Sequence, residues 1–201
     1  MNEYKMIPLS YTSLEPIIDD LTLNIHYGYH YKTYTDKLNK LLKEINFSYN
    51  MTPEYLALNP DIIPSNYQNE ILYNLGGYLN HTLYFDNLTP VKKEVPTTFL
   101  NLINKYFTSF DNFKDTFISY AKEVKGSGYT FLVLDNNNLR IINLPNQDSP
   151  YYYGMIPLMN IDVWEHAYYL EYTYKREEYL NNIFNIIDWD KVYNRYLDNI
   201  K

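Results

Sequence analysis

Apolar and aromatic side chains recur at helical spacing through the first half of the chain. Between residues 20 and 45 they are Leu21, Ile25, Tyr29, Leu38, Leu41, Leu42 and Ile45. This spacing predicts one long helix with a kink near Gly28. Pro64 opens a second helical pattern that continues through Phe85 and stops before Pro90. Two long helices joined by a polar loop predict an antiparallel helical hairpin.

The second half of the chain mixes helical and extended patterns. Amphipathic stretches predict helices over residues 97–107 and 110–125, and Gly126-Ser127-Gly128 ends the second of them. Residues 174–184 and 188–200 predict two further helices at the end of the chain.

Three extended segments lie between these helices. Residues 129–134 and 139–144 flank the turn Asp135-Asn136-Asn137-Asn138, which predicts a β-hairpin. Residues 155–163 form a third extended segment. Together the three predict a small antiparallel sheet.

These patterns place the chain in the α+β fold class. We expect an N-terminal antiparallel helical hairpin domain over residues 1–90 and a C-terminal α/β domain with a three-stranded antiparallel sheet over residues 91–201. A chain of 201 residues is long enough to bury a core without disulfides.

Composition narrows the possible functions. Because the chain has no cysteine, any metal must be held by imidazole and carboxylate, which suits iron, manganese or zinc better than copper(I) or an iron–sulfur cluster. A net charge of -7 without a Lys/Arg cluster argues against a nucleic-acid partner. The start, MNEYKMIPLSYTSLEP, has no signal-peptide pattern, and no stretch approaches roughly 18 uninterrupted apolar residues. We therefore expect a cytoplasmic protein that does not enter a membrane.

Asp162 and His166 are the first candidates for a metal site. They stand four positions apart at the end of the third extended segment, where the chain can turn both side chains toward one point. Such a pair is more often a solvated surface pair than a metal site, so further ligands are needed. His26 and His81 supply them if the two hairpin helices face each other, although a single histidine is more often satisfied by a backbone carbonyl.

Six short motifs follow one another along nearly the whole chain. They are Leu14-Glu15-Pro16, His26 with His30 and Tyr34, Asn80-His81, Gly126-Ser127-Gly128, Asn146-Gln147-Asp148 and Asp162-Val163-Trp164-Glu165-His166-Ala167-Tyr168-Tyr169. In this order and spacing they resemble the iron/manganese superoxide dismutase family, and DVWEHAYYLEY is highly specific to it. The resemblance implies an antioxidant oxidoreductase that converts two superoxide anions and two protons to oxygen and hydrogen peroxide.

The same resemblance implies the metal ligands. His26, His81, Asp162 and His166 correspond to the four protein ligands of one manganese or iron ion per subunit. Three neutral imidazoles and one carboxylate leave a fifth position for solvent. A trivalent ion with hydroxide then carries the same net charge as a divalent ion with water, so each electron is accompanied by a proton.

Five further residues match functional positions of the family. Tyr34 resembles the tyrosine at the mouth of the substrate channel, and His30 resembles its neighbour. Gln147 resembles the glutamine that hydrogen-bonds the metal-bound solvent. Glu165 and Tyr168 resemble the pair that reaches across a homodimer interface, which implies a second copy of the chain as partner.

The choice of metal depends on a few positions. Gly77, four residues before His81, together with Gln147 is the manganese-type arrangement, whereas iron-type members usually place the glutamine at the former position. Asn160 departs from the glycine that is frequent in manganese-type chains. We expect manganese, with iron or dual-metal use as the alternative.

Two competing functions are weaker interpretations of the same residues. A catalytically inactive, superoxide-dismutase-like interaction protein would be expected to lose ligands, Gln147 or Tyr34 first, and all are present. A mononuclear iron oxygenase normally uses two histidines and one carboxylate, so three histidines argue against it.

Overall fold

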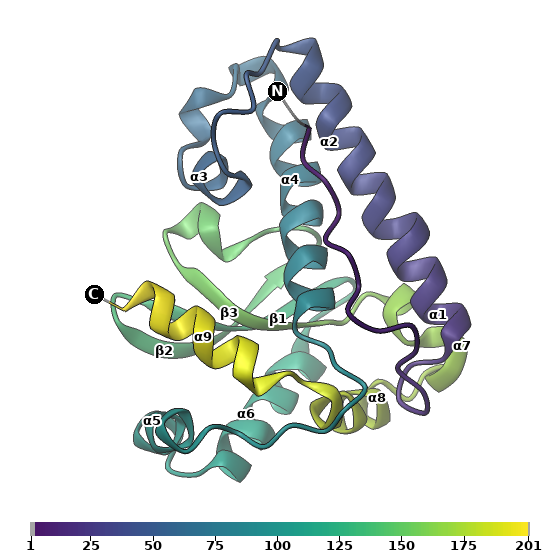
Figure 1. Cartoon of the computed structure of the whole chain (residues 1–201), viewed down its shortest axis with the longest axis vertical. Coiled ribbons are helices and arrows are strands. Elements are labelled where there is room, and N and C mark those ends of the chain that lie inside the picture. The colour runs from purple at the N-terminus through teal and green to yellow at the C-terminus, as the bar shows by residue number, and fades with distance from the viewer. Residues whose placement is uncertain (1–2, 201) are drawn as a thin grey trace.

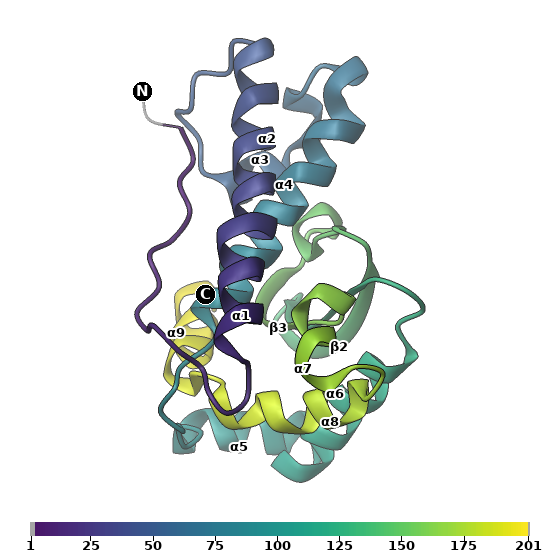
Figure 2. The same cartoon turned by 90° about the vertical axis from the view of Figure 1, so that its right-hand side faces the viewer.

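Two long antiparallel helical segments form the N-terminal half of the protein (Figure 1). In this computed structural model residues 3–200 are described, so Met1, Asn2 and Lys201, the outer ends of the two predicted domains, lie outside the described residues. The first segment runs through α1 (Asp20–Ile25), a π-helical stretch (His26–Tyr31) and α2 (Lys32–Glu44). The second is α4 (Ser65–Asp86), and α2 and α4 lie side by side in both views (Figures 1 and 2). The predicted helical hairpin is confirmed.

The irregularity expected near Gly28 takes the form of the π-helical stretch. The segment begins at Asp19, whose side chain accepts a hydrogen bond from the Thr22 amide at 2.5 Å and caps α1. From His26 to Tyr31 the helix widens to the π-helical hydrogen-bonding pattern, which is frequently found at functional sites. The widened turn carries His26 and His30, and the helix continues without a break into α2.

The connection between the hairpin helices is more structured than the polar loop expected from the sequence. It contains α3 (Pro53–Leu58) and a 3-10 turn (Pro60–Ile62). Thr52 caps α3 by accepting a hydrogen bond from the Tyr55 amide at 3.1 Å, and Pro53 occupies the first helical position. Leu56 is fully buried, so α3 adds to the hairpin core.

The sheet of the C-terminal half has three antiparallel strands in the order β2-β1-β3. The strands are β1 (Gly128–Asp135), β2 (Asn138–Pro145) and β3 (Ile156–Asp162). Asn136 and Asn137 join β1 to β2 with φ angles of 47° and 64°. A two-residue type I′ hairpin turn requires positive φ angles at both positions. The central strand β1 pairs Tyr129 with Asp162 on β3, and this register fixes where β3 ends. All three predicted strands are confirmed.

The helices of the C-terminal half pack around the sheet. They are α5 (Thr97–Phe107), α6 (Phe110–Glu123), the short α7 (Tyr169–Tyr172), α8 (Arg176–Ile183) and α9 (Trp189–Asn199). An aromatic cluster joins α6 to the 3-10 turn before α9 and to the first residue of α9. The Phe117 and Phe184 rings are 5.6 Å apart, and the Phe110 and Trp189 rings are 5.3 Å apart. The four helices predicted for this half are confirmed, so the α+β fold class is confirmed as well.

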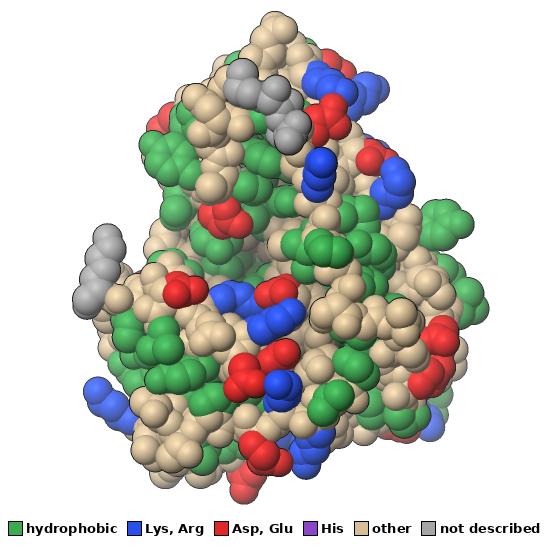
Figure 3. All heavy atoms as spheres, viewed as in Figure 1, with side chains coloured by type: hydrophobic (Ala, Val, Ile, Leu, Met, Phe, Trp, Pro, Cys, Tyr) green, Lys and Arg blue, Asp and Glu red, His purple; other side chains and the backbone are tan. Residues whose placement is uncertain are grey.

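Ion pairs link α9 to the end of α4 and to the segment that follows α4. Asp86 pairs with Arg195 and, at 2.8 Å, with Lys191. Lys93 pairs with Asp190 at 2.9 Å. On the face that α9 crosses, Lys and Arg side chains lie next to Asp and Glu side chains (Figure 3). Within residues 3–200, no helix has the length and apolar character needed to span a membrane.

Candidate metal centre

Four side chains from four different segments converge on one point between the two halves. His26 comes from the π-helical stretch, His81 from α4, Asp162 from the last position of β3, and His166 from the 3-10 turn that follows. One ligand atom from each lies within 4.8 Å of the ligand atoms of the other three. Asp162 Oδ2 is 3.2 Å from His26 Nε2 and 3.4 Å from His166 Nε2.

Backbone groups orient two of these side chains. The Nδ1 atom of His81 lies 2.6 Å from the Gly77 carbonyl oxygen, which turns Nε2 toward the centre. The Trp164 amide donates to Asp162 Oδ1 at 2.8 Å and leaves Oδ2 to face the imidazoles. The Tyr179 hydroxyl donates to the main-chain carbonyl of Asp162 at 2.9 Å and holds the end of β3.

Among residues 3–200, the four converging atoms have no hydrogen-bond partner. They are the Nε2 atoms of His26, His81 and His166 and the Oδ2 atom of Asp162, and all four are buried. Buried polar atoms without partners are costly, and four of them facing one point is the arrangement that a bound cation satisfies. Three imidazole nitrogens and one carboxylate suit manganese or iron, so the donor set fits such an ion.

Burial favours neutral His26 and His81, and the neighbouring histidines keep Asp162 ionised. Burial lowers the pKa of His26 to about 4, and it lowers the pKa of His81 well below its usual value. Burial by itself would raise the pKa of Asp162, but the adjacent His166 and His26 hold it below its usual value. Neutral imidazoles and an ionised carboxylate can bind a metal without first losing protons.

Three more predicted residues lie around this centre. The Gln147 side-chain amide donates to the Tyr34 hydroxyl at 3.2 Å, and its own Oε1 is buried without a partner. The Tyr34 ring lies 5.2 Å from the His81 ring. The His30 ring stacks on His166 with 4.0 Å between centroids. Burial raises the pKa of Tyr34, so its phenol keeps its proton at neutral pH.

Two adjacent glycines of α4 make room for this arrangement. A Cβ atom on Gly77 would lie 2.8 Å from Cε1 of Tyr34 and closer still to two other carbons of that ring. A Cβ atom on Gly76 would meet the main-chain carbonyl of Gln147. Only glycine lets α4 approach both residues this closely, which gives a physical reason for the glycine at position 77.

Glu165 and Tyr168 lie apart from the converging atoms. Glu165 is exposed on the 3-10 turn. Tyr168 is buried within its own chain, where its hydroxyl accepts a hydrogen bond from Arg176 Nε at 3.0 Å. The other Arg176 nitrogens donate to the carbonyls of Val124 and Gly126. The role of Glu165 and Tyr168 between subunits therefore stays a prediction.

Sequence reasoning missed a pair of buried tyrosines beside the centre. The Tyr84 and Tyr179 hydroxyls are 3.2 Å apart, and the Tyr84 ring lies 5.0 Å from the His26 ring. Among 25 tyrosines neither position stands out by composition. The one available signal is the spacing of Tyr84 three positions after His81, which places it one helical turn further along α4.

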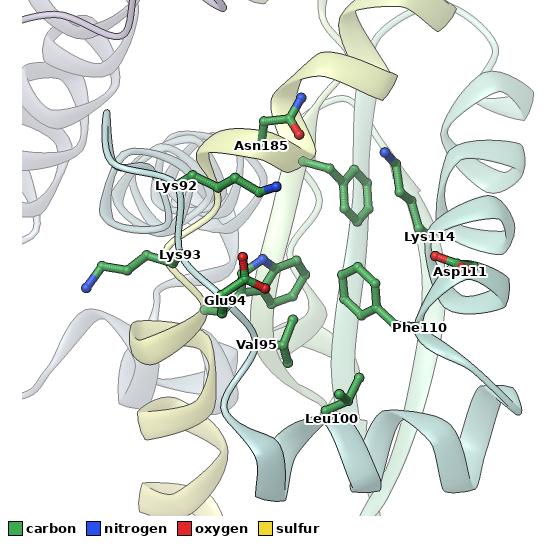
Figure 4. Close-up of a pocket in the computed structure, with 11 residues that line it drawn as sticks. Lys92, Lys93, Glu94, Val95, Leu100, Phe110, Asp111, Lys114 and Asn185 are labelled. Atoms are coloured by element: carbon green, nitrogen blue, oxygen red, sulfur yellow. The ribbon is translucent and has the colours of Figure 1, made fainter.

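A surface cavity of about 360 Å³ contains none of the predicted site residues. Its lining comes from residues 92–95, from α5 and α6, and from the segment that leads into α9. In the close-up Lys93 points away from the cavity, while Lys92 and Lys114 enter from different sides (Figure 4). The candidate metal centre is instead a cluster of four buried ligand atoms.

Comparison with known proteins identifies the family of the chain. The family profile described as "Iron/manganese superoxide dismutases, alpha-hairpin domain" matches residues 3–89, and "Iron/manganese superoxide dismutases, C-terminal domain" matches residues 96–195. The chain is 39% identical over 204 residues to proteins named superoxide dismutase (Mn) 2 from Bacillus cereus and from Bacillus anthracis, with 100% of this chain and 98% of each relative covered. The chain therefore belongs to the iron/manganese superoxide dismutases, oxidoreductases that act on superoxide with manganese or iron.

Proposed function

We propose that His26, His81, Asp162 and His166 hold one manganese ion on which the chain converts superoxide to oxygen and hydrogen peroxide. The observation that carries the proposal is the set of four buried, unpartnered ligand atoms within 4.8 Å of one another. When bound, the ion supplies the redox chemistry by taking an electron from one superoxide and giving an electron to a second.

The protein side chains then have separate tasks. Asp162 supplies the single negative charge among the four ligands, and the neutral imidazoles leave the overall charge of a bound cation positive. Gln147 and Tyr34, joined by their 3.2 Å hydrogen bond, form the polar pair that passes a proton toward the site. His30, stacked on His166, fills the space beside the ligand and limits which molecules enter.

Manganese is proposed over iron for two reasons. The Gly77 and Gln147 combination matches the manganese-type pattern, and Gly77 leaves room for the Tyr34 ring against α4. Both named Bacillus relatives carry manganese in their names. Iron binds through the same kinds of donor atoms, so the preference rests on the residues around the ligands.

We also propose a homodimer in the cytoplasm. The exposed Glu165 next to ligand His166 is available to a second copy of the chain, which supports an interface near the site. Light scattering tests this part of the proposal, because a monomer at micromolar concentration would contradict it. The cytoplasmic location rests on the sequence pattern alone and is tested by cell fractionation.

The proposed metal is tested by stripping the protein and reloading separate samples with manganese and with iron. Elemental analysis and dismutase activity are then measured on each sample. Activity with manganese alone supports the proposal, and activity with both metals replaces it by dual-metal use. Full metal loading without activity in either sample would contradict it and favour an interaction protein.

A further inference from the structure

A cavity of about 310 Å³ lies where the helical hairpin, β3 and α9 meet. Its lining comes from the N-terminal segment, α3, α4, the 3-10 turn Pro150–Tyr153, β3 and α9. The face drawn in Figure 3 is hollowed between the hairpin half and α9. None of the candidate metal ligands lines this cavity. Its volume is at the small end of the range of ligand-binding pockets, so a small molecule fits it.

Part of the cavity lining is apolar. Leu79 and Leu83 stand one turn apart on α4 and are 5% and 9% exposed. Ile7 of the N-terminal segment and Pro157 of β3 complete this part of the lining. Because burial of apolar area is favourable, these side chains offer a surface for an aliphatic chain.

Glu54 brings an unmatched negative charge to the cavity. It is the second residue of α3 and is partly buried. None of the ion pairs within residues 3–200 includes it. Asp86, the other carboxylate of the lining, is already paired with Lys191 and Arg195. A carboxylate that is partly removed from water without an ion-pair partner favours a bound cation.

Tyr151 adds an unused hydroxyl to the same lining. Within residues 3–200, the neighbouring Tyr152 and Tyr153 hydroxyls donate hydrogen bonds at 2.5 and 3.2 Å, whereas the Tyr151 hydroxyl has no hydrogen-bond partner. Burial and, after it, the charge of Glu54 raise the pKa of Tyr151, so the phenol stays protonated at neutral pH. Its oxygen can accept a hydrogen bond from a cationic N–H group that also reaches Glu54.

The one arginine of the lining is already occupied. Arg195 NH1 donates to Asn87 Oδ1 and to the Leu158 carbonyl, each at 2.6 Å. Its NH2 pairs with Asp86. These bonds leave Glu54 as the unpaired charge of the lining, so the cavity favours a cation over an anion.

We propose that this cavity binds a small organic cation that carries a primary ammonium group on a short aliphatic chain. The ammonium group donates to the Glu54 carboxylate and to the Tyr151 hydroxyl oxygen. The chain packs against Leu79 and Leu83. This binding is separate from the proposed metal centre and does not depend on the dismutase reaction.

The test is isothermal titration calorimetry of the manganese-loaded protein with n-butylammonium chloride at neutral pH and low ionic strength. The matched ligand is n-butanol, which has the same chain without the charge. We expect one n-butylammonium ion per chain, and we expect n-butanol to bind at least about tenfold more weakly. Absence of n-butylammonium binding, or equal affinity for the two ligands, would overturn the proposal.

Glu54→Gln tests the ion pair, because it removes the charge and keeps the size of the side chain. We expect it to weaken n-butylammonium binding about tenfold to a hundredfold. Glu123→Gln is the matched control, because Glu123 is exposed at the end of α6, outside the cavity lining, and the same charge is removed. Equal weakening in the two variants would mean that only the net charge of the protein attracts the amine, and it would overturn the proposal.

Tyr151→Phe gives a second, independent test, because it removes the hydroxyl and keeps the ring. We expect it to weaken binding about twofold to tenfold. Unchanged binding in both Tyr151→Phe and Glu54→Gln would overturn the proposed site. Manganese content and dismutase activity of Glu54→Gln should equal those of the wild type, because Glu54 is not one of the four converging groups. Failure of the cation site would therefore leave the proposed function intact, and loss of the proposed function would leave the cation site intact.

Discussion

The side-chain amide of Gln147 donates to the Tyr34 hydroxyl at 3.2 Å, although the two residues are 113 positions apart in sequence. Tyr34 belongs to α2 of the helical hairpin, and Gln147 follows β2 in the C-terminal half. The glycine at position 77 lets the Tyr34 ring lie against α4. The polar pair beside the candidate ligands therefore exists only when the two halves of the chain are packed together.

Replacing Gln147 with alanine tests the value of this pair. Gln147→Ala removes the donor to Tyr34 and the buried amide beside the ligands, so dismutase activity should fall about 10–100-fold at equal metal content. Gln68→Ala is the control, because Gln68 donates to the Pro60 carbonyl at 3.0 Å and lies at the other end of α4 from the candidate ligand His81. Equal activity per metal ion in the two variants would rule out a role for Gln147.

Replacing Gly77 with alanine tests the close approach of α4 to Tyr34. The added methyl would lie within 2.8 Å of ring carbon Cε1, so the ring or the helix must shift. We expect Gly77→Ala to lower the free energy of unfolding by about 1–3 kcal/mol and to reduce activity. Gly28→Ala is the matched control, because an added Cβ there meets nothing within 4 Å, and alanine should raise helix stability by about 0.5–1 kcal/mol. Thermal unfolding of both variants measures the difference.

Replacing Tyr179 with phenylalanine tests the support of Asp162. The hydroxyl donates to the Asp162 carbonyl at 2.9 Å in a fully buried position, so Tyr179→Phe leaves that carbonyl without this donor. The expected loss is about 1–3 kcal/mol of unfolding free energy. Tyr153→Phe removes a hydroxyl from a side chain that is 57% exposed and should change stability much less. Similar losses in chemical denaturation of the two variants would contradict this account.

The ion pairs of Asp86 predict an acid-dependent contribution to stability. Burial by itself would raise the pKa of Asp86, but Lys191 and Arg195 outweigh burial and hold it below the usual 3.8. A carboxyl with a lowered folded-state pKa stabilises the protein above its unfolded pKa, and the contribution is lost as the pH falls through the folded value. Metal-free protein should therefore melt at a higher temperature than metal-free Asp86→Asn at about pH 6, with the gap closing toward about pH 3. A gap that is constant with pH would contradict the ion-pair explanation.

The elements of the fold were predictable where the sequence signal is local. The periodicity from Leu21 to Ile45 and the turn at Asn136 and Asn137 each depend on neighbours in sequence, and both gave the observed elements. The π-helical form of the turn at His26 depends on which carbonyl accepts the hydrogen bond of each backbone amide. The pattern of apolar positions along the sequence does not determine this. Helix α3 was missed because six residues are too few to show a periodicity.

The candidate ligands were predictable only as a set. Asp162 and His166 are close in sequence, but His26 and His81 join them through packing of the hairpin against β3. The hydrogen bonds around the candidate ligands depend still more on packing. Asn160 contacts Asn80 and Asn87, and Tyr179 contacts Tyr84, over long separations in sequence. No local pattern of Asn or Tyr residues predicts such pairs in a chain with 25 tyrosines.

The most direct test of the central claim is the metal content of two histidine variants. His81 supplies one of the four converging atoms, whereas His30 stacks on His166 without being one of them. After identical loading with manganese and removal of free metal, elemental analysis should find about one ion per chain in the wild type and in His30→Ala, and close to none in His81→Ala. Full manganese content in His81→Ala, or its loss in His30→Ala alone, would contradict the proposed metal centre.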